Sequence, residues 1–258
     1  MKDKKLLEVD FDFFSTRLFD EVVWINFQKN LLIQATSLEN RDVLLSYLDK
    51  VSACDFIKVI VLRSSLEESG HKEFINFFKV IKSKERNLDL HRLYNVYASL
   101  ILKINALNKI VVHSTGGDVI PLFLNMSLAC DYRIAAENTI FRNSHLDIGV
   151  LPIGGGPYFL SRKIGPGKAY ELLVLKKEYS AAEGIQYGIV DKIVPLAELE
   201  TETLKIAHHF GRVPAKTLIG IKRLVNFSTK DLKSYFDFEN QEMFRIIHDN
   251  EFRSQPGS

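Results

Sequence analysis

The chain has 258 residues, of which 46% are hydrophobic and 26% are charged, and its formal net charge is +2. This composition is typical of a soluble globular protein, and so small a charge gives no basis for a nucleic-acid or membrane partner. No apolar run approaches the ~20 residues of a membrane span, and the N-terminus lacks the apolar core and cleavage site of a signal peptide. We therefore expect a cytoplasmic protein.

The two cysteines, Cys54 and Cys130, are far apart in the sequence and lie in apolar surroundings. Two reduced core thiols are the favoured interpretation, and a disulfide or a shared metal site is the alternative.

The first half of the chain alternates strand-like and helix-like patterns. Two β-branched runs, Val22–Phe27 and Phe56–Leu62, have the length and composition of strands. Between them, the apolar residues from Leu38 to Val51 have helical spacing, and Ser37 precedes them as an N-cap. A strand, a helix and a strand in this order predict a right-handed βαβ unit with a parallel strand pair.

A similar alternation follows. The amphipathic stretch from Lys72 to Leu107 predicts helix, and Lys109–Thr115 predicts the next strand. Leu122–Ala129 then predicts a short helix, and the sequences DYRIAAE and TIFRN predict two short extended pieces.

The composition changes after Gly149, where turn-forming residues become frequent. Ser180-Ala-Ala-Glu183 has the pattern of a capping box that opens a helix, and Gly188–Val194 predicts a last short strand. The remainder of the chain is almost wholly helical in pattern. We therefore expect an α/β core over residues 1–195 and a helical region over residues 196–258. That region either caps its own core or lies across a neighbouring subunit, and the sequence alone does not choose.

The sequence does not contain a complete nucleotide-binding or metal-binding motif. Gly154-Gly155-Gly156 lacks the last glycine of GxGxxG, and Gly167-Lys168 lacks both the first glycine and the final Ser/Thr of a P-loop. The sequence contains no HExxH, CxxC or GxSxG motif. We therefore expect neither a metal site nor a bound cofactor.

Four stretches, in the right order, resemble the signature of the crotonase superfamily, the enoyl-CoA hydratase/isomerase enzymes. They are NKIVVHSTGG, SLACDYRIAAENTIF, LDIGVLPIGGGPYFLSRKIGPGKAYELLV and SAAEGIQYGIVDKIVP. The resemblance implies a crotonase-like ββα spiral core with a helical C-terminal region, assembled as a homotrimer or a dimer of trimers. It also implies an acyl-CoA thioester as ligand, with coenzyme A present only as part of that substrate.

In this family two backbone N–H groups hold the thioester oxygen as it becomes an enolate, and each donor of such an oxyanion hole is worth about 10²–10³ in rate. Counting back from Cys130 places one donor on Leu122, because the family's three-glycine run falls on Pro121, Leu122 and Phe123. A backbone N–H survives any substitution except proline, so Leu122 keeps its donor, and Pro121 suits the first turn of a helix. The side chains of Leu122 and Phe123 either crowd the thioester or shape a different pocket. Gly117 falls on the glycine before the loop.

The other donor belongs to the first loop, Ser64–Phe74, whose alignment is uncertain by one or two residues. Ser69 or Gly70 is the best match to the family's donor, and His71 lies beside them. We expect Gly117, Pro121, Phe123 and His71 to contact the substrate, and the alternative for His71 is a solvated loop histidine.

The family's hydratases use two glutamates to position water and to move its proton, and these positions fall on Asn125 and His145. Asparagine cannot act as a base, whereas histidine has an ordinary pKa near 6.5 that suits proton transfer at neutral pH. Asp147 would share a face with His145 and orient the imidazole if this segment is extended. If the segment is a loop, the sequence gives no reason to place Asp147 beside His145.

We therefore expect an acyl-CoA isomerase, lyase or hydrolase rather than a standard hydratase, with His145, Asn125 and Asp147 as catalytic residues. The alternative is a non-catalytic subunit that binds an acyl group or only assembles with other subunits. A cleft at Leu122 and His145 favours the enzyme, and filling of that space by Leu122 and Phe123 favours the alternative.

Overall fold

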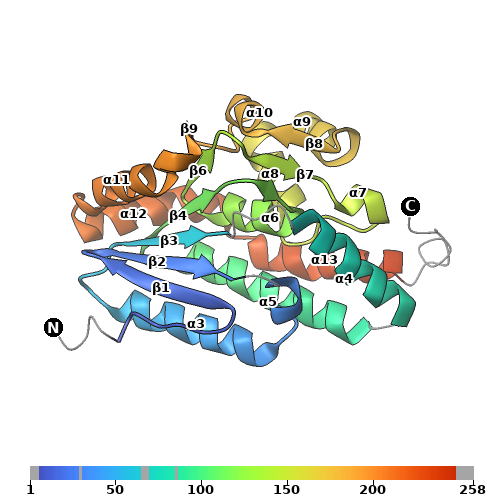
Figure 1. The fold of residues 1–258 in the computed structure, drawn as a ribbon, viewed down its shortest axis with the longest axis horizontal. Coiled ribbons are helices and arrows are strands. Elements are labelled where there is room, and N and C mark those ends of the chain that lie inside the picture. Colours follow the sequence, from blue (N-terminus) through green and yellow to red (C-terminus); the bar gives the residue numbers. More distant parts are fainter. Residues whose placement is uncertain (1–5, 29–30, 65–69, 85–86, 248–258) are drawn as a thin grey trace.

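The computed structural model describes residues 6–28, 31–64, 70–84 and 87–247. A six-stranded sheet has the strand order β1-β2-β3-β4-β6-β9, and a three-stranded sheet has the order β5-β7-β8. Helices cover both faces of the larger sheet (Figure 1). The expected α/β class with a helical C-terminal region is confirmed.

The larger sheet begins with a hairpin that the sequence patterns did not predict. β1 (Phe14–Phe19) pairs antiparallel with β2 (Val22–Phe27). Asp20 has a φ of 49°, a left-handed conformation that suits a two-residue hairpin turn.

The predicted βαβ unit is confirmed. β2 is followed by the four-residue helix α2 (Leu31–Gln34), α3 (Leu38–Ala53) and β3 (Val59–Arg63), which pairs parallel with β2. The Ser37 side chain accepts a hydrogen bond from the backbone N–H of Asn40, so the predicted N-cap is also confirmed.

The long amphipathic stretch divides into two helices, α4 (Gly70–Lys84) and α5 (Asn87–Ala106), ahead of β4 (Ile110–Thr115). All six residues of β4 are buried, because helices cover both of its faces. One hydrophobic cluster packs between the sheet, α3 and α5, and a second lies between the other face and α11. β4 therefore forms the centre of the core, from which the following loop leaves.

That loop leads into the small sheet and the short helices around it. Gly117, with a φ of 66°, turns the chain from β4 into the two-residue strand β5. Arg142 joins the three strands of the small sheet by ion pairs with Asp118 and Glu178. The elements that follow β4 are β5 (Asp118–Val119), α6 (Pro121–Ala129), β6 (Tyr132–Ala136), β7 (Ile140–Arg142), α7 (His145–Ile148), α8 (Gly156–Ile164), α9 (Pro166–Tyr170), a π-helical turn (Glu171–Leu175) and β8 (Glu178–Ser180).

The capping box at Ser180 and Glu183 is confirmed, and it opens α10 (Ala181–Gln186). The predicted strand Gly188–Val194 is shorter than expected, because only β9 (Lys192–Val194) pairs with β6. Gly188 has a φ of 70°, so the segment begins with a turn rather than extended backbone. Cys54 and Cys130 are both free, which confirms two unpaired thiols.

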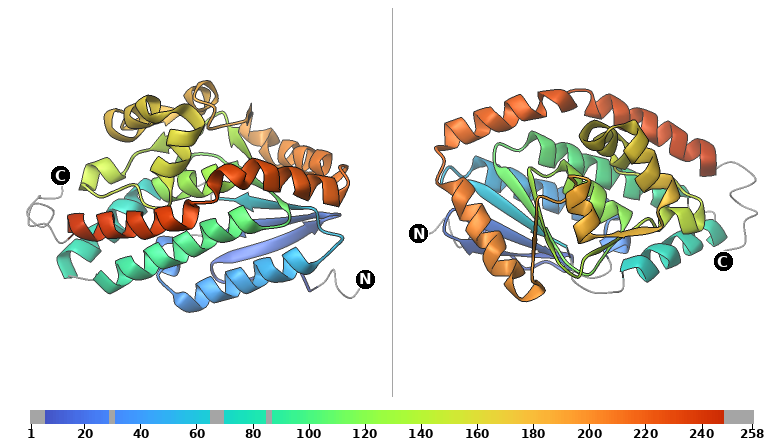
Figure 2. Two further views of the ribbon diagram at one scale, coloured as in Figure 1. Left: turned by 180° about the vertical axis from the view of Figure 1, so that it is seen from behind. Right: turned by 90° about the horizontal axis from the view of Figure 1, so that it is seen from above.

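The C-terminal helices pack on their own chain. α11 (Leu199–Gly211) contacts β2, β3, β4 and β6, and α13 (Leu232–Ile247) contacts α5. α12 (Ala215–Val225) connects them, and Figure 2 shows the three helices following one another around the outside of the core. A division between residues 195 and 196 remains a prediction. None of the described helices is long and apolar enough to cross a membrane.

Candidate functional site

The N-terminus of α6 carries the first candidate donor. Ile120 is the N-cap residue and Pro121 occupies the first turn, and every residue of the helix except Phe123 is buried. The first backbone hydrogen bond of the helix runs from the Leu124 N–H to the Ile120 carbonyl at 3.1 Å. The N–H groups of Leu122 and Phe123 precede that bond and have no acceptor within the helix. They lie at the positive end of the helix dipole, where a developing oxyanion is stabilised.

The start of α4 lies against the entry to α6. A Cβ atom on Gly70 would lie 3.4 Å from Ile120 Cγ2 and 3.6 Å from the Asp118 carbonyl oxygen. The structure therefore brings the first-loop segment that begins at Gly70 next to the residues that lead into Leu122. Ser69, the other candidate donor, lies outside the described residues.

Asn125 ties α6 to the glycine-rich loop that precedes α8. Its Nδ2 atom donates to the Ile153 carbonyl at 2.7 Å and lies 3.4 Å from the Pro152 carbonyl. Gly156 approaches the same side chain so closely that a Cβ atom there would lie 2.6 Å from Asn125 Oδ1. The Asn125 amide is thus engaged in packing the loop on the helix.

His145 is the first residue of α7 and only 3% exposed. Its Nε2 atom lies 2.9 Å from the Leu173 carbonyl oxygen, so Nε2 carries the proton and Nδ1 the lone pair. Among the described residues, Nδ1 has no hydrogen-bond partner. Burial lowers the pKa of His145, although the Leu173 bond and the charge of Asp147 oppose this shift. The imidazole is therefore neutral at pH 7.

His145 and Asp147 were expected to share a face only if their segment was extended, and it is not. Residues from His145 to Ile148 form a helix rather than extended backbone, so the alternation of a strand does not apply. Any catalytic role of His145 remains a prediction.

Asp147 instead lies beside His71, near the start of α4. The His71 Nδ1 atom is 2.8 Å from the Ser144 hydroxyl, and its Nε2 atom is 3.9 Å from Asp147 Oδ2. The side chains of His71 and Asp147 are 34% and 37% exposed, whereas Ser144 is buried. Lys177 Nζ lies 4.0 Å from the other oxygen of Asp147. Ser144 was not predicted as a site residue, although the pattern Ser-His-Leu-Asp over residues 144–147 places three polar groups together.

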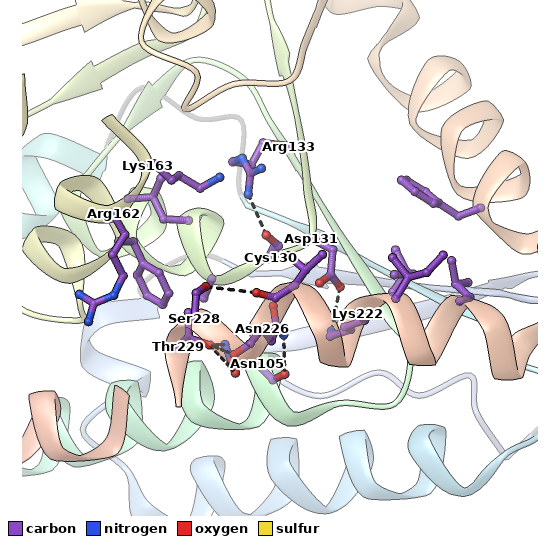
Figure 3. Close-up of a pocket in the computed structure, with 18 residues that line it drawn as sticks. Asn105, Cys130, Asp131, Arg133, Arg162, Lys163, Lys222, Asn226, Ser228 and Thr229 are labelled. Atoms are coloured by element: carbon purple, nitrogen blue, oxygen red, sulfur yellow. Dashed lines mark hydrogen bonds and ion pairs between the residues drawn. The ribbon is translucent and has the colours of Figure 1, made fainter. Parts of the chain in front are cut away.

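Side chains fill the space around the candidate donor. Leu122 is 2% exposed, and Phe123 packs partly buried against the main core. Four well-formed pockets on the described part of the chain are lined by other residues than Leu122, Phe123 and His145. One of them, with a volume of about 350 Å³, lies at the opposite end of α6 (Figure 3).

Comparisons with known proteins identify relatives over most of the chain. The chain is 29% identical over 202 residues to a crotonyl-CoA hydratase of Syntrophomonas wolfei subsp. wolfei, covering 78% of this chain and 74% of that protein. It is 28% identical over 165 residues to a trans-2-decenoyl-[acyl-carrier-protein] isomerase of Streptococcus mutans serotype c, covering 64% of this chain and 63% of that protein.

The fold is also shared with solved structures. An enoyl-CoA hydratase from Bacillus halodurans gives a TM-score of 0.81 at 20% identity, covering 94% of this chain and 98% of the other. A family model described as enoyl-CoA hydratase/isomerase matches residues 23–256. The chain therefore belongs to the enoyl-CoA hydratase/isomerase family, as its four motifs predict.

Proposed function

We propose that this protein binds an acyl-CoA thioester with the thioester oxygen on the N–H of Leu122, and that it stabilises the enolate formed there. The observation that carries the proposal is the Leu122 N–H at the start of α6, which has no acceptor within the helix. The segment that begins at Gly70 lies against Ile120, two residues before Leu122. Coenzyme A enters only as part of the substrate. Two relatives are named for a CoA-linked and an acyl-carrier-protein-linked substrate, which supports an acyl thioester as the ligand class.

The proposed chemistry is not standard hydration. Neither Asn125 nor His145 is a carboxylate, and the Asn125 amide is engaged with the Ile153 carbonyl. A pair of acidic groups that positions water and transfers its proton is therefore missing at these positions. Isomerisation, decarboxylation and hydrolysis of a carbon–carbon bond need only an enolate-stabilising site and one proton-transfer group.

The best-placed proton-transfer group is His71. The Ser144 hydroxyl fixes its Nδ1 atom, and the distance of 3.9 Å from Asp147 leaves Nε2 outside hydrogen-bond range of that carboxylate. Nε2 is therefore available to a substrate proton, and the Asp147 charge stabilises the imidazolium that forms. His145 is a weaker candidate because its ring is buried and Nε2 is bonded to Leu173.

The test is exchange of the α-protons of hexanoyl-CoA in D₂O, followed by NMR, because exchange reports enolate formation whatever the net reaction is. We expect exchange in the unaltered protein and a loss of about 100-fold or more in His71→Gln. The matched control is His209→Gln, which changes an exposed histidine of α11. Exchange that survives His71→Gln and disappears in His145→Gln would return the role to His145, provided that both variants remain folded by circular dichroism.

One observation favours a second candidate function, a non-catalytic acyl-binding or assembly subunit. The Leu122 side chain is buried, and none of the four pockets reaches it. Saturable binding of hexanoyl-CoA with no α-proton exchange in the unaltered protein would support this function and refute the enzyme.

We further propose that the chain self-associates, as a homotrimer or a dimer of trimers. Large apolar side chains on α12 and the turn after it are 53–79% exposed, and such a patch is typical of an interface. They are Ile221, Leu224, Val225 and Phe227. Light scattering on the eluting protein would measure the mass of the assembly, and a monomer would contradict the proposal.

A further inference from the structure

The pocket of about 350 Å³ lies where the core meets the C-terminal helices. The C-terminal end of α6, α8, α11, α12 and the turn after α12 form its walls, and Figure 3 shows their side chains converging on it. Its volume falls within the range of about 300–1,000 Å³ that is usual for small-molecule sites. Apolar side chains make up much of the wall, among them Leu128, Ala129, Phe159, Phe210, Leu218 and Ile221.

One charged pair in the pocket is already neutralised. Lys222 Nζ lies 2.8 Å from Asp131 Oδ2 and also donates to the carbonyls of Ile104 and Lys109 at 3.2 and 2.9 Å. The same oxygen of Asp131 accepts the Val111 N–H at 2.7 Å. The ammonium group therefore has three partners, and this pair leaves no net charge for a ligand.

Two further cations line the pocket, Arg133 and Lys163. Arg133 is 5% exposed, and its terminal nitrogens bind the Cys130 carbonyl and Asp191, but among the described residues its Nε atom has no partner. Lys163 has no hydrogen bond or ion pair with any described residue. The Lys163 amine points toward Arg133 (Figure 3). Partial burial and the Arg133 charge lower the pKa of Lys163, and the Asp191 charge offsets only part of this shift.

We propose that this pocket is a second binding site, for a small amphipathic anion with a carboxylate on an alkyl chain. The carboxylate lies at Lys163, where it relieves the repulsion from Arg133, and the alkyl chain lies among the apolar residues. At about 30 Å³ for each non-hydrogen atom, the pocket holds about ten to twelve such atoms. Octanoate, with an eight-carbon chain and two oxygens, is therefore a suitable probe.

This site is separate from the proposed thioester site. The two lie at opposite ends of α6, where Leu122 and Ala129 are about 10 Å apart along the axis at the rise of an α-helix. The inference therefore does not depend on the proposed function, and a protein without α-proton exchange would still bind the anion.

The experiment is calorimetric titration of the intact protein with octanoate, octan-1-ol and acetate. We expect saturable binding of octanoate, at least tenfold weaker binding of octan-1-ol and no binding of acetate. Lys163→Gln should raise the dissociation constant for octanoate about three- to tenfold, since the lost contact is at a partly exposed rim. Lys233→Gln, at an exposed lysine of α13 outside the pocket, should not change it.

A variant that fills the pocket completes the test. Ala129→Leu places extra atoms among the apolar walls, and it should abolish octanoate binding while hexanoyl-CoA exchange persists. If that variant fails to fold, Ser228→Trp fills the pocket from its exposed rim and leaves the four residues of the proposed interface unchanged. Three results would overturn the proposal. The first is no saturable binding of octanoate, which is expected if a second copy of the chain covers the pocket. The others are an octanoate affinity in Lys163→Gln equal to that of the unaltered protein, and displacement of octanoate by hexanoyl-CoA.

Discussion

The Nδ1 atom of His71 lies 2.8 Å from the Ser144 hydroxyl, although 73 positions separate the two residues in the sequence. This contact joins the start of α4, next to the candidate donor loop, to the segment that carries His145 and Asp147. Ser144 is buried and His71 is partly exposed, so the hydrogen bond holds one edge of the imidazole against the core.

Loss of that hydroxyl should impair proton transfer without removing the base. In Ser144→Ala the His71 ring loses its anchor, and we expect hexanoyl-CoA α-proton exchange to slow about three- to tenfold, which is less than in His71→Gln. Ser46→Ala, at an exposed serine of α3, serves as the control and should exchange at the unaltered rate. An unchanged rate in Ser144→Ala would show that the serine does not position His71.

Asn125 should contribute to stability through its contact with the loop before α8. Asn125→Ala leaves the Ile153 carbonyl without its 2.7 Å donor, and we expect the free energy of unfolding to fall by about 1–3 kcal/mol. Asn125→Asp should cost more, because it places a carboxylate against carbonyl oxygens in a buried site. Urea unfolding measures both, and an aspartate variant as stable as the unaltered protein would contradict the role given to the amide.

Glu239 should make the stability of the fold depend on pH. It is 5% exposed and accepts the N–H groups of Gly154 and Gly155 at 2.9 and 3.0 Å. Burial raises its pKa to about 7, although these two bonds and one from Tyr235 oppose the shift.

Since the folded pKa lies above the unfolded value, the stabilising contribution is complete below about pH 4.5 and is lost as the pH rises through 7. Between these limits the free energy of unfolding of the unaltered protein should fall by on the order of 3 kcal/mol relative to that of Glu239→Gln, whose side chain does not ionise. Unfolding in urea from pH 4.5 to 8 checks this difference. Parallel curves for the two proteins would rule out the proposed titration of Glu239.

The buried pair of Lys222 and Asp131 should be essential to the packing of α12 on the core. The Lys222 side chain is 3% exposed and Asp131 is 15% exposed, and the two are 2.8 Å apart. Lys222→Met leaves the carboxylate without its cation, and we expect a loss of about 3–5 kcal/mol in the free energy of unfolding. Lys233→Met, on the surface of α13, should change it by less than about 0.5 kcal/mol. A comparable loss in both variants would contradict the assignment.

Local patterns predicted much of the fold because they report local physics. Ser37 and Ser180 cap helices through residues three positions away, and β2, α3 and β3 each have their own periodicity. The same patterns missed β1, and they did not separate α4 from α5, where the amphipathic pattern continues across the break.

The site was predictable in position but not in contacts. The count from Cys130 placed Leu122 at the start of a helix, as the structure has it. The partners of Asn125 and His145 are carbonyls 28 positions away in the chain, which no spacing rule identifies. The pairing of His71 with Ser144 likewise depends on the packing of α4 against α7.

The most direct test of the central claim is the infrared spectrum of a thioester carbonyl bound to the protein. With hexanoyl-CoA carrying ¹³C at the carbonyl, the isotope-edited difference spectrum isolates that single bond. If the Leu122 N–H polarises the carbonyl, the carbonyl stretch of the bound thioester lies at lower wavenumber than that of free hexanoyl-CoA. We expect this shift to remain in Leu122→Ala, which keeps the N–H, and to disappear in Leu122→Pro, which removes it. The first turn of a helix tolerates proline, so Leu122→Pro should still fold. A bound carbonyl with the free frequency, or a shift that survives Leu122→Pro, would contradict the account.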